Sequence, residues 1–403
     1  MTDKAYRVRA GRCDHTADDE TIFQTLRRLT DPLERSWERL EAARCVAIKV
    51  NLVWYPDRLR STAGRFQELV DPAVLRALLR LLRERIKARL VVADTSLMFG
   101  ENAGADVHFR PLLADYGVEF VDCNQPPSVE FEVPGGGQMF DRYLLHPILR
   151  EADELISATC LKSHAFMGVT LTTKNLFGLC PIHDGNRPRQ YYHHIIRMPY
   201  FLADLGRVLN PCLNIVDGLV GQSVREWGGE ARITDTLVAG DHPIATDICG
   251  ASLMGNDPGA DWPTPPFRRD RNHLRCAAEA GFGPASLDEV DFEHDLEVPV
   301  GDFDSQETDS AERVASWRRS MCEQALDYAE HRARYEAEHP HRYILLQDGV
   351  VLWEGEVLRG LPSRRKISGA KPDRAIWLKY VDPDDWEREH FEVYARELAG
   401  VPA

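Results

Sequence analysis

The stretch that decides the fold reads CVAIKV at residues 45–50, and RLVVAD follows it at residues 89–94. Each is a short, largely apolar run rich in β-branched residues, which is typical of a buried strand. Between them, Asp71 and Pro72 supply a helix N-cap and a first-turn proline, and leucines continue to about Lys87. A strand, a helix and a second strand with short connections predict a parallel pair of strands with the helix on one face.

The alternation continues beyond this unit. A helix is expected over about 107–116, and a strand over 118–122. The triple glycine at 135–137 is expected to form a turn between two extended segments, because it lacks the preceding strand and following helix of a dinucleotide-binding loop. A second run of α/β character begins near residue 155. Its expected elements are strands over 155–160, 213–216 and 235–239 and a helix over 247–254.

These elements predict an α/β fold with three parts. Residues 1–150 form an N-terminal α/β portion, residues 151–309 a second α/β portion with a loop-rich end, and residues 310–403 a small α+β accessory unit. In the last part, two apolar runs flank Asp348-Gly349, which is the signature of a hairpin. We expect two mainly parallel sheets around a shared cleft, with the accessory unit packed outside it. Homo-oligomer contacts are one role that this unit could serve.

The composition is that of an acidic globular protein. The chain has 403 residues, a formal net charge of −15, 43% hydrophobic residues and 28% charged residues. This charge repels phosphate backbones and anionic lipid, so no nucleic-acid or membrane partner is expected. We expect a cytoplasmic protein, because the sequence has neither a signal peptide nor an apolar run of about eighteen residues. Nine cysteines without a C-x-x-C pair predict neither an iron–sulfur cluster nor a structural disulfide.

The densest polar group in apolar surroundings reads LKSH at 161–164 and TLTTKNLFG at 170–178. Lys162 and His164 follow a predicted strand, and their alternation puts both side chains on one side of an extended backbone. Lys174 lies in a stretch that would otherwise be plain core, where an ammonium is costly unless it meets a counter-charge. A structural salt bridge explains either lysine alone, but so many polar groups in so short a stretch favour a functional site.

Polar residues also stand at the ends of the other predicted strands. Ligands of open α/β sheets bind beyond the carboxyl ends of the strands, so these residues are candidates. Each residue alone is weak evidence for a site, since Asp-Gly after a strand is ordinarily a turn. The evidence is that all of them stand at strand ends. The candidates for substrate binding are Lys49, Asn51, Asp94, Thr170, Thr173, Asn175 and Asp217.

Several short motifs, taken in order, resemble one known family. They are IKVNL at 48–52, Asp94, LKSH at 161–164, Thr170 with KNLFG at 174–178, Asp217-Gly218 and DHPIATD at 241–247. In this combination the sequence resembles the family catalogued as domain of unknown function 362, over roughly residues 45–257. Many members carry a ferredoxin-like module with clustered cysteines. This sequence lacks that module, so we do not expect it to share iron–sulfur electron transfer with those members. The layout is also loosely similar to the nickel-pincer lactate racemase, whose histidine pairs could not be aligned with this sequence.

The favoured function is an enzyme that acts on a small anionic metabolite bearing a carboxylate or a phosphate. The reaction would be of the lyase, isomerase or cyclase type. Specialised metabolism is one setting in which such an enzyme could act. The catalytic candidates are Lys162, His164 and Lys174. Lys49 and Lys162 would hold the anion, the two asparagines would orient it, and His164 or Lys174 would move the proton.

Two further functions remain open. One is a metal-dependent oxidoreductase that uses Asp217 and a divalent metal, for which His164, His183 and His193 are the candidate ligands. The other is a non-catalytic binding protein for a small anion. A metal assay separates the oxidoreductase from the proton-transfer enzyme, and isotope exchange at an activated C–H bond separates the enzyme from the binding protein.

Overall fold

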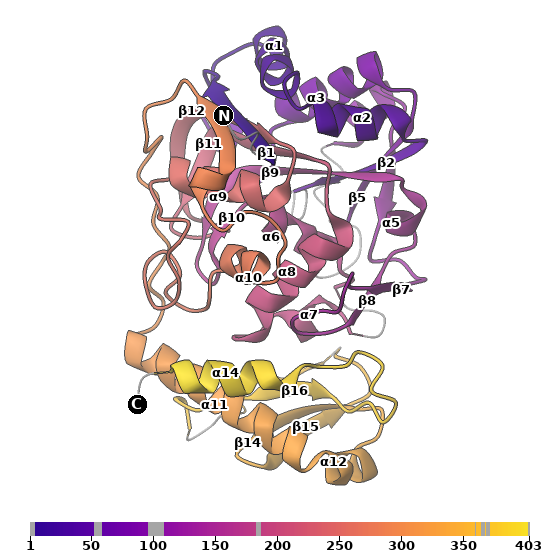
Figure 1. Ribbon diagram of the computed structural model, residues 1–403, viewed down its shortest axis with the longest axis vertical. Coiled ribbons are helices and arrows are strands. Elements are labelled where there is room, and N and C mark those ends of the chain that lie inside the picture. The colour runs from indigo at the N-terminus through magenta and orange to yellow at the C-terminus, as the bar shows by residue number, and fades with distance from the viewer. Residues whose placement is uncertain are drawn as a thin grey trace.

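One large sheet runs through the middle of the protein (Figure 1). In the computed structural model, the described residues are 5–51, 59–95, 109–182, 187–358, 360–363, 367 and 371–401. The strands of the sheet are β1 (Tyr6–Arg12), β2 (Cys45–Val50), β5 (Arg89–Asp94), β6 (Glu119–Asp122), β9 (Glu154–His164), β10 (Gly168–Thr170), β11 (Leu213–Ser223), β12 (Glu230–Gly240) and β13 (Val290–His294). Their order is β13-β1-β12-β11-β9-β2-β5-β6, and β10 pairs with β9.

The sheet is mainly parallel, as predicted. Strand β2 pairs in parallel with both β5 and β9, β9 pairs in parallel with β11, and β5 with β6. Antiparallel pairing is found where β12 lies between β1 and β11, and where β10 folds back on β9. Because β2 and β9 are hydrogen-bonded neighbours, the two predicted α/β portions are halves of a single sheet.

Helices cover both faces of the sheet. They are α1 (Asp19–Thr30), α2 (Glu34–Ala42), α3 (Pro72–Arg85), α4 (Arg110–Asp115), α5 (Ile148–Glu151), α6 (Thr172–Leu176), α7 (Arg189–Tyr192), α8 (Arg197–Leu209), α9 (Pro243–Leu253) and α10 (His273–Glu279). Successive residues of a strand point to opposite faces. Ile48 and Val92 accordingly share a core with residues of α1, α2 and α3, whereas Ala47 and Val91 belong to a second core with residues of α8.

The elements that decide the fold form as the sequence predicts. Strands β2 and β5 have the expected bounds, and the Asp71 side chain caps α3 by accepting a hydrogen bond of 2.9 Å from the Ala73 N–H. The triple glycine lies in the turn between β7 (Val129–Glu132) and β8 (Arg142–Leu145), an antiparallel pair. Gly135 and Gly136 both have positive φ, a conformation that glycine adopts without strain.

Three differences from the predicted elements bear on the site. Strand β9 does not end at residue 160 but continues to His164, because β10 pairs with its last residues. The stretch 258–309, expected to be loop-rich, contains α10 and β13, and β13 joins the main sheet beside β1. Strand β1 itself was not predicted. Its sequence YRVRAGR is too polar to indicate a buried strand, and the segment is extended because neighbouring strands pair with it.

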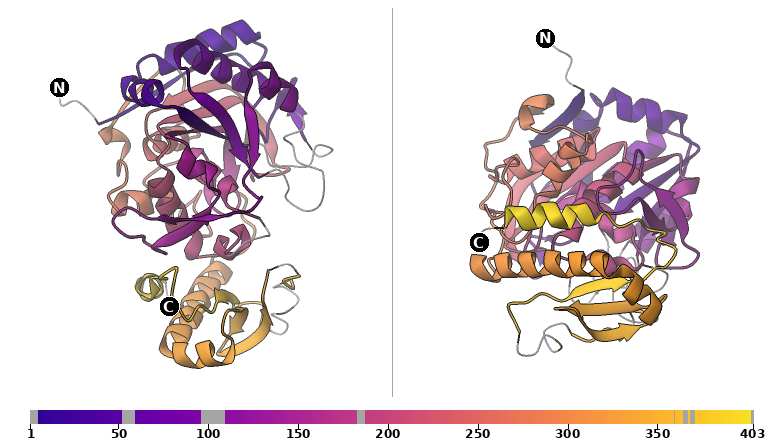
Figure 2. Two further views of the ribbon diagram at one scale, coloured as in Figure 1. Left: turned by 90° about the vertical axis from the view of Figure 1, so that its right-hand side faces the viewer. Right: turned by 60° about the horizontal axis from the view of Figure 1, so that its bottom comes forward.

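The C-terminal part is a small α+β unit at one end of the molecule (Figure 2). Its elements are α11 (Ala311–Glu330), α12 (Arg332–Glu338), β14 (Tyr343–Gln347), β15 (Val350–Gly355), β16 (Trp377–Tyr380) and α14 (Phe391–Gly400). The strands form an antiparallel sheet in the order β15-β14-β16. The predicted hairpin forms at Asp348-Gly349, where both residues have positive φ as its tight turn requires.

Buried ion pairs attach this unit to the rest of the protein. Arg197 of α8 donates to Glu389 at 2.8 Å, and Arg187 pairs with Glu387. Lys379 bridges the two carboxylates, at 2.5 Å from Glu387 and 2.7 Å from Glu389. All five side chains are at most 5% exposed. Since a buried charge left without its partner costs several kcal/mol, the network fixes the unit in one position.

The remaining elements are short. They are β3 (Ser61–Thr62), which pairs with β4 (Arg65–Phe66), and the 3-10 turns η3 (Phe177–Leu179) and η4 (Leu287–Glu289). All nine cysteines are described, and eight of them are buried, as small hydrophobic residues are. Among the described helices, none combines the length and the apolar character that crossing a bilayer needs.

Candidate functional site

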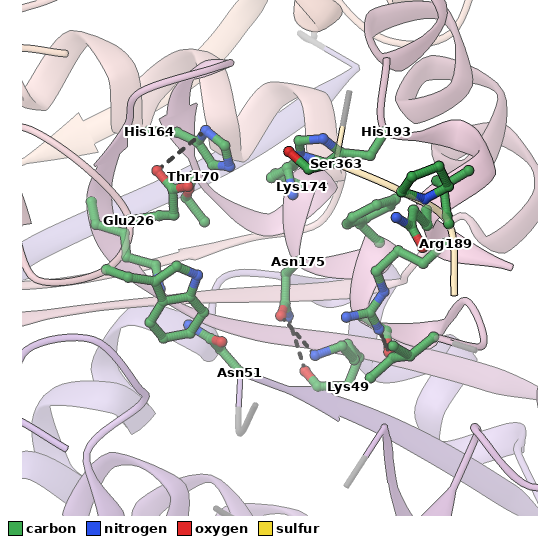
Figure 3. A pocket seen from close by; sticks show the side chains of 18 residues that line it. Lys49, Asn51, His164, Thr170, Lys174, Asn175, Arg189, His193, Glu226 and Ser363 are labelled. Carbon is green, nitrogen blue, oxygen red and sulfur yellow. Dashed lines mark hydrogen bonds and ion pairs between the residues drawn. The ribbon is translucent and has the colours of Figure 1, made fainter. Parts of the chain in front are cut away.

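A cavity of about 560 Å³ opens at the carboxyl ends of β2 and β9 (Figure 3). The position agrees with the general place of ligand sites in open α/β sheets. Eight of the candidate residues line it together: Lys49, Asn51, Lys162, His164, Thr170, Lys174, Asn175 and His193. Asp94, Thr173 and Asp217 lie outside its lining. The fold therefore gathers residues from β2, β9, β10 and α6 that are separated by up to 126 positions.

Lys49 is held in a fully buried polar group. Its Nζ lies 3.0 Å from Asp94 Oδ2 and donates to Asn175 Oδ1 at 3.0 Å. The Asn175 amide in turn donates to the main-chain oxygens of Lys49 and Ala158 at 3.2 and 3.0 Å. Burial lowers the pKa of Lys49 and raises that of Asp94, and each charge opposes the shift of the other. This ion pair links the ends of β2 and β5, and the Asp94 carboxylate balances the charge of Lys49.

Gly178 makes room for this ion pair. A Cβ at that position would lie 2.7 Å from Lys49 Nζ and 3.0 Å from Asp94 Oδ1. Distances this short force a neighbour to move, and both neighbours are tightly held atoms of a buried pair. A glycine at the end of the KNLFG motif is thus explained by close packing.

Lys162 and Asn51 converge on one carbonyl group. Lys162 Nζ and Asn51 Nδ2 donate to the main-chain oxygen of Glu68 at 2.7 and 3.0 Å. The ammonium of Lys162 also lies 4.6 Å from the ring centroid of Trp227, within the range of a cation–π interaction. Lys162 is 1% exposed, so its charge is fixed beside the cavity without a carboxylate partner among the described residues.

Lys174 is the cation of the cavity with the fewest partners. Its Nζ makes no hydrogen bond or ion pair with any residue that the structure describes, and lies 4.3 Å from the ring centroid of Phe177. Burial, followed by the repulsion of Arg189 and Lys162, lowers the pKa of Lys174 to about 7, although the charge of Glu226 opposes this shift. At neutral pH a large share of this side chain is therefore a free amine that faces the cavity.

His164 is a neutral imidazole with a defined tautomer. Its Nδ1 accepts hydrogen bonds from the Phe166 and Met167 N–H groups at 3.0 and 3.1 Å, so the ring proton resides on Nε2. Burial lowers the pKa of His164 to about 3, even though Glu226 Oε2 lies 3.5 Å from Nδ1. Nε2 has no hydrogen-bond partner among the described residues. This geometry makes His164 a hydrogen-bond donor toward the cavity.

Glu226 places a carboxylate on the rim of this basic cavity. Burial works against its ionisation, but the neighbouring His164 and the Ala165 N–H, which donates to Oε2 at 3.1 Å, lower its pKa. The cavity therefore contains a carboxylate, an uncharged imidazole and a titrating amine.

Asp247 positions the helix that carries Lys174. Its carboxylate accepts hydrogen bonds from the N–H groups of Thr172 and Thr173, both at 2.8 Å, and from Thr172 Oγ1 at 2.5 Å. It supplies the N-terminal cap that Leu171, the residue before α6, cannot provide. The last residue of the DHPIATD motif thus contributes to the site by capping α6.

We expect Asp247→Ala to lower the free energy of unfolding by about 1–3 kcal/mol, because it strands two buried N–H groups at the start of α6. Urea unfolding of the variant measures the loss. Asp288→Ala, which removes an exposed carboxylate, is the matched control and should leave stability within about 0.5 kcal/mol. Equal stability of the two variants would contradict the capping role.

Asp217 does not lie at a strand end as predicted, because β11 continues to Ser223, and its carboxylate binds main-chain N–H groups. Its Oδ2 accepts from the Asp71 N–H at 2.7 Å and its Oδ1 from the Leu219 N–H at 3.0 Å. Burial and the neighbouring Asp71 carboxylate raise the pKa of Asp217 to about 7. In the structure it ties β11 to the start of α3. Its predicted role in substrate binding stays a prediction.

The three candidate metal ligands are not seen together. His183 lies outside the described residues, and His164 uses Nδ1 for two backbone hydrogen bonds. His193 lines the cavity and packs on Phe166, with ring centroids 5.0 Å apart. Among the described residues, the one group with ligand atoms close enough for a metal is elsewhere, at Asp14, His15 and Asp235.

Residues that no motif indicated complete the cavity. Arg189 donates to the carbonyl oxygens of Gly178 and Cys180 at 2.8 and 3.1 Å, which fixes its guanidinium beside the lysines. Glu226 and Trp227 come from the segment between β11 and β12. Leu361, Pro362 and Ser363 come from the C-terminal unit. The prediction that this unit packs outside the cleft is wrong, because its residues 361–363 line the cavity.

Comparison with known proteins agrees with the resemblance of the motifs. The sequence model of a family described as domain of unknown function (DUF362) matches residues 46–252. The chain is also similar to the Thylakoid-associated protein sll1697 of Synechocystis sp., with 25% identity over 251 residues. The aligned region covers 59% of this chain and 71% of that protein. Residues 46–252 contain the main sheet apart from β1 and β13 and most of the cavity lining, and stop before the C-terminal unit.

Proposed function

Because this chain belongs to the DUF362 family, whose description assigns no activity, we propose a function from its cavity: an enzyme that removes a proton from a small anionic substrate. The observation that carries the proposal is Lys174, a buried amine without a counter-ion among the described residues and with a pKa of about 7. A general base works best when its pKa lies near the working pH. His164, with a pKa of about 3, is the weaker candidate for this role.

The other groups of the cavity suit the binding of an anion. Lys162 and Arg189 present fixed positive charge, and the free Nε2–H of His164 adds a hydrogen-bond donor. Such charge acts locally even in an acidic protein, because salt screens the distant charges within a Debye length of about 8 Å. The expected ligand carries a carboxylate or a phosphate.

The proposed step is proton abstraction beside a carbonyl or carboxylate. The amine of Lys174 takes the proton, and the C–H electron pair moves to the conjugated oxygen, whose negative charge the cations stabilise. Return of the proton at another carbon gives an isomerase, and loss of a leaving group gives a lyase. Both reactions belong to the class expected from the sequence.

Pyridoxal 5′-phosphate with borohydride reduction tests the amine and the anion site together. Its phosphate should bind the cations, and its aldehyde condenses only with an uncharged amine. We expect labelling of Lys174 to rise with pH through a midpoint of about 7, because the amine loses its proton there. An ordinary lysine reaches its midpoint near pH 10.4. Peptide mass spectrometry locates the label.

Two controls make this experiment decisive. Lys87→Met, which removes an exposed lysine, should leave labelling at Lys174 unchanged, and inorganic phosphate should compete with the reagent. A labelling midpoint near 10, or no protection by phosphate, would contradict the proposal. Labelling as expected but without deuterium exchange at any C–H of bound carboxylates in D₂O would support a non-catalytic anion-binding protein instead.

A further inference from the structure

The cavity is larger than a small carboxylate or phosphate requires. Its volume is about 560 Å³. An anion of three or four carbon atoms would fill a minor part of this space. The volume lies in the range of sites that bind substantially larger organic molecules.

Aromatic and apolar side chains line the cavity beside its cations. Trp227 is half-buried on the segment after β11, and Phe177 lies on η3 below the lysine. Leu361 and Pro362 come from the C-terminal unit. Aromatic rings and a proline ring are the surfaces on which another planar ring packs best. The cavity therefore combines a cationic region with walls suited to a ring.

Buried ion pairs hold the C-terminal unit, which contributes this wall, against the main domain. Arg187 and Arg197 of the main domain form buried ion pairs with carboxylates of the segment after β16. Figure 3 shows Ser363, from the same segment as Leu361, beside Lys174 and His193. A preformed wall adds affinity because little conformational freedom is lost on binding.

We propose that the substrate is an aromatic anion: an aromatic group joined to the carboxylate or phosphate that the cations bind. The aromatic group occupies the space between Trp227 and the 361–363 segment, so the C-terminal unit selects the substrate. This inference rests on the proposed function, whose anion site it uses. It adds the class of substrate and assigns a role to a part of the chain outside the family match.

A series of carboxylates tests the inference on the full-length protein. The probes are acetate, cyclohexylacetate and phenylacetate, whose dissociation constants can be measured by ligand-observed NMR. We expect phenylacetate to bind about 50-fold more tightly than acetate, as burial of its apolar surface implies, and more tightly than cyclohexylacetate. The variants Trp227→Leu and Leu361→Ala should each lower the ratio of phenylacetate affinity to acetate affinity at least fivefold.

Val357→Ala is the matched control for Leu361→Ala, because it shortens a 58% exposed side chain of the same unit and should change no affinity. Equal affinities for phenylacetate and acetate would overturn the aromatic substrate but leave the anion site intact. Equal affinities for phenylacetate and cyclohexylacetate would overturn its aromatic character. Selectivity that survives both wall variants would overturn the assigned walls. Binding of none of the three anions would contradict the proposed function itself.

Discussion

Replacing Lys174 with methionine will abolish the proton transfer and at the same time stabilise the fold. The methionine keeps the apolar stem and removes the ammonium, which has no counter-ion among the described residues. Loss of a general base typically costs a factor of about 10²–10⁴ in rate. Because burial lowers the pKa of Lys174 from 10.5 to about 7, the variant should gain about 2–4 kcal/mol of stability at pH 7.

The sign of the pH dependence follows from the direction of this shift. Between pH 7 and 10.5 the unfolded chain holds a proton on Lys174 that the folded chain has released. Unfolding then binds a proton, so the contribution of Lys174 to stability rises with pH across this window. Urea unfolding at several pH values should show this rise in the wild type and not in Lys174→Met.

Lys87→Met is the control for the loss of one lysine charge, since Lys87 is exposed. It should change stability by less than about 0.5 kcal/mol at every pH. If Lys174→Met instead loses about 3–5 kcal/mol, a carboxylate has been left without its partner. Lys174 would then be half of a structural ion pair, and the base would have to be sought elsewhere.

Breaking the ion pair between Lys49 and Asp94 will destabilise the protein more than any other single change in the cavity. The two side chains are 2% and 0% exposed, with 3.0 Å between Nζ and Oδ2. Lys49→Met leaves a buried carboxylate without its ammonium, and Asp94→Asn leaves a buried ammonium without its carboxylate. We expect each variant to lose about 3–5 kcal/mol, measured by urea unfolding.

The double variant Lys49→Met with Asp94→Leu removes both charges and should recover a large part of this loss, since no charge then remains unpaired. An exposed ion pair provides the comparison. Arg89 lies 2.5 Å from Glu119 with both side chains more than half exposed, so Arg89→Met should cost less than about 1 kcal/mol. A double variant no more stable than the single variants would show that hydrogen bonds to Asn175, and not charge, hold this part of the site.

The order of the central elements could be predicted because their signals are local. The runs at 45–50 and 89–94 are buried on both faces, so nearly every residue in them is apolar, and Asp71-Pro72 marks the start of the intervening helix. Strand β1 could not be recognised in this way. It owes its conformation to hydrogen bonds with β12 and β13, which lie more than two hundred positions away.

The sequence by itself determined the basic half of the site. Lys162 and His164 stand at the end of a strand, and Lys174 and Asn175 stand in an apolar stretch, so their place near the sheet edge follows from patterns within a few residues. Only the tertiary structure decided which of these charges is matched. Lys49 meets Asp94 from the neighbouring strand, whereas Lys174 meets no carboxylate among the described residues. That contrast depends on distances that no sequence pattern encodes.

Tertiary structure also supplied the rest of the cavity. Arg189, Glu226 and Trp227 lie in segments of ordinary polar composition, and residues 361–363 belong to a unit that the sequence marks as separate. A single charged residue in a polar segment looks the same whether it faces solvent or a cavity, because exposed charges are common. What distinguishes these residues is that segments up to about three hundred positions apart come together around the cavity. Buried ion pairs such as Arg197 with Glu389 form between distant segments only in the folded chain.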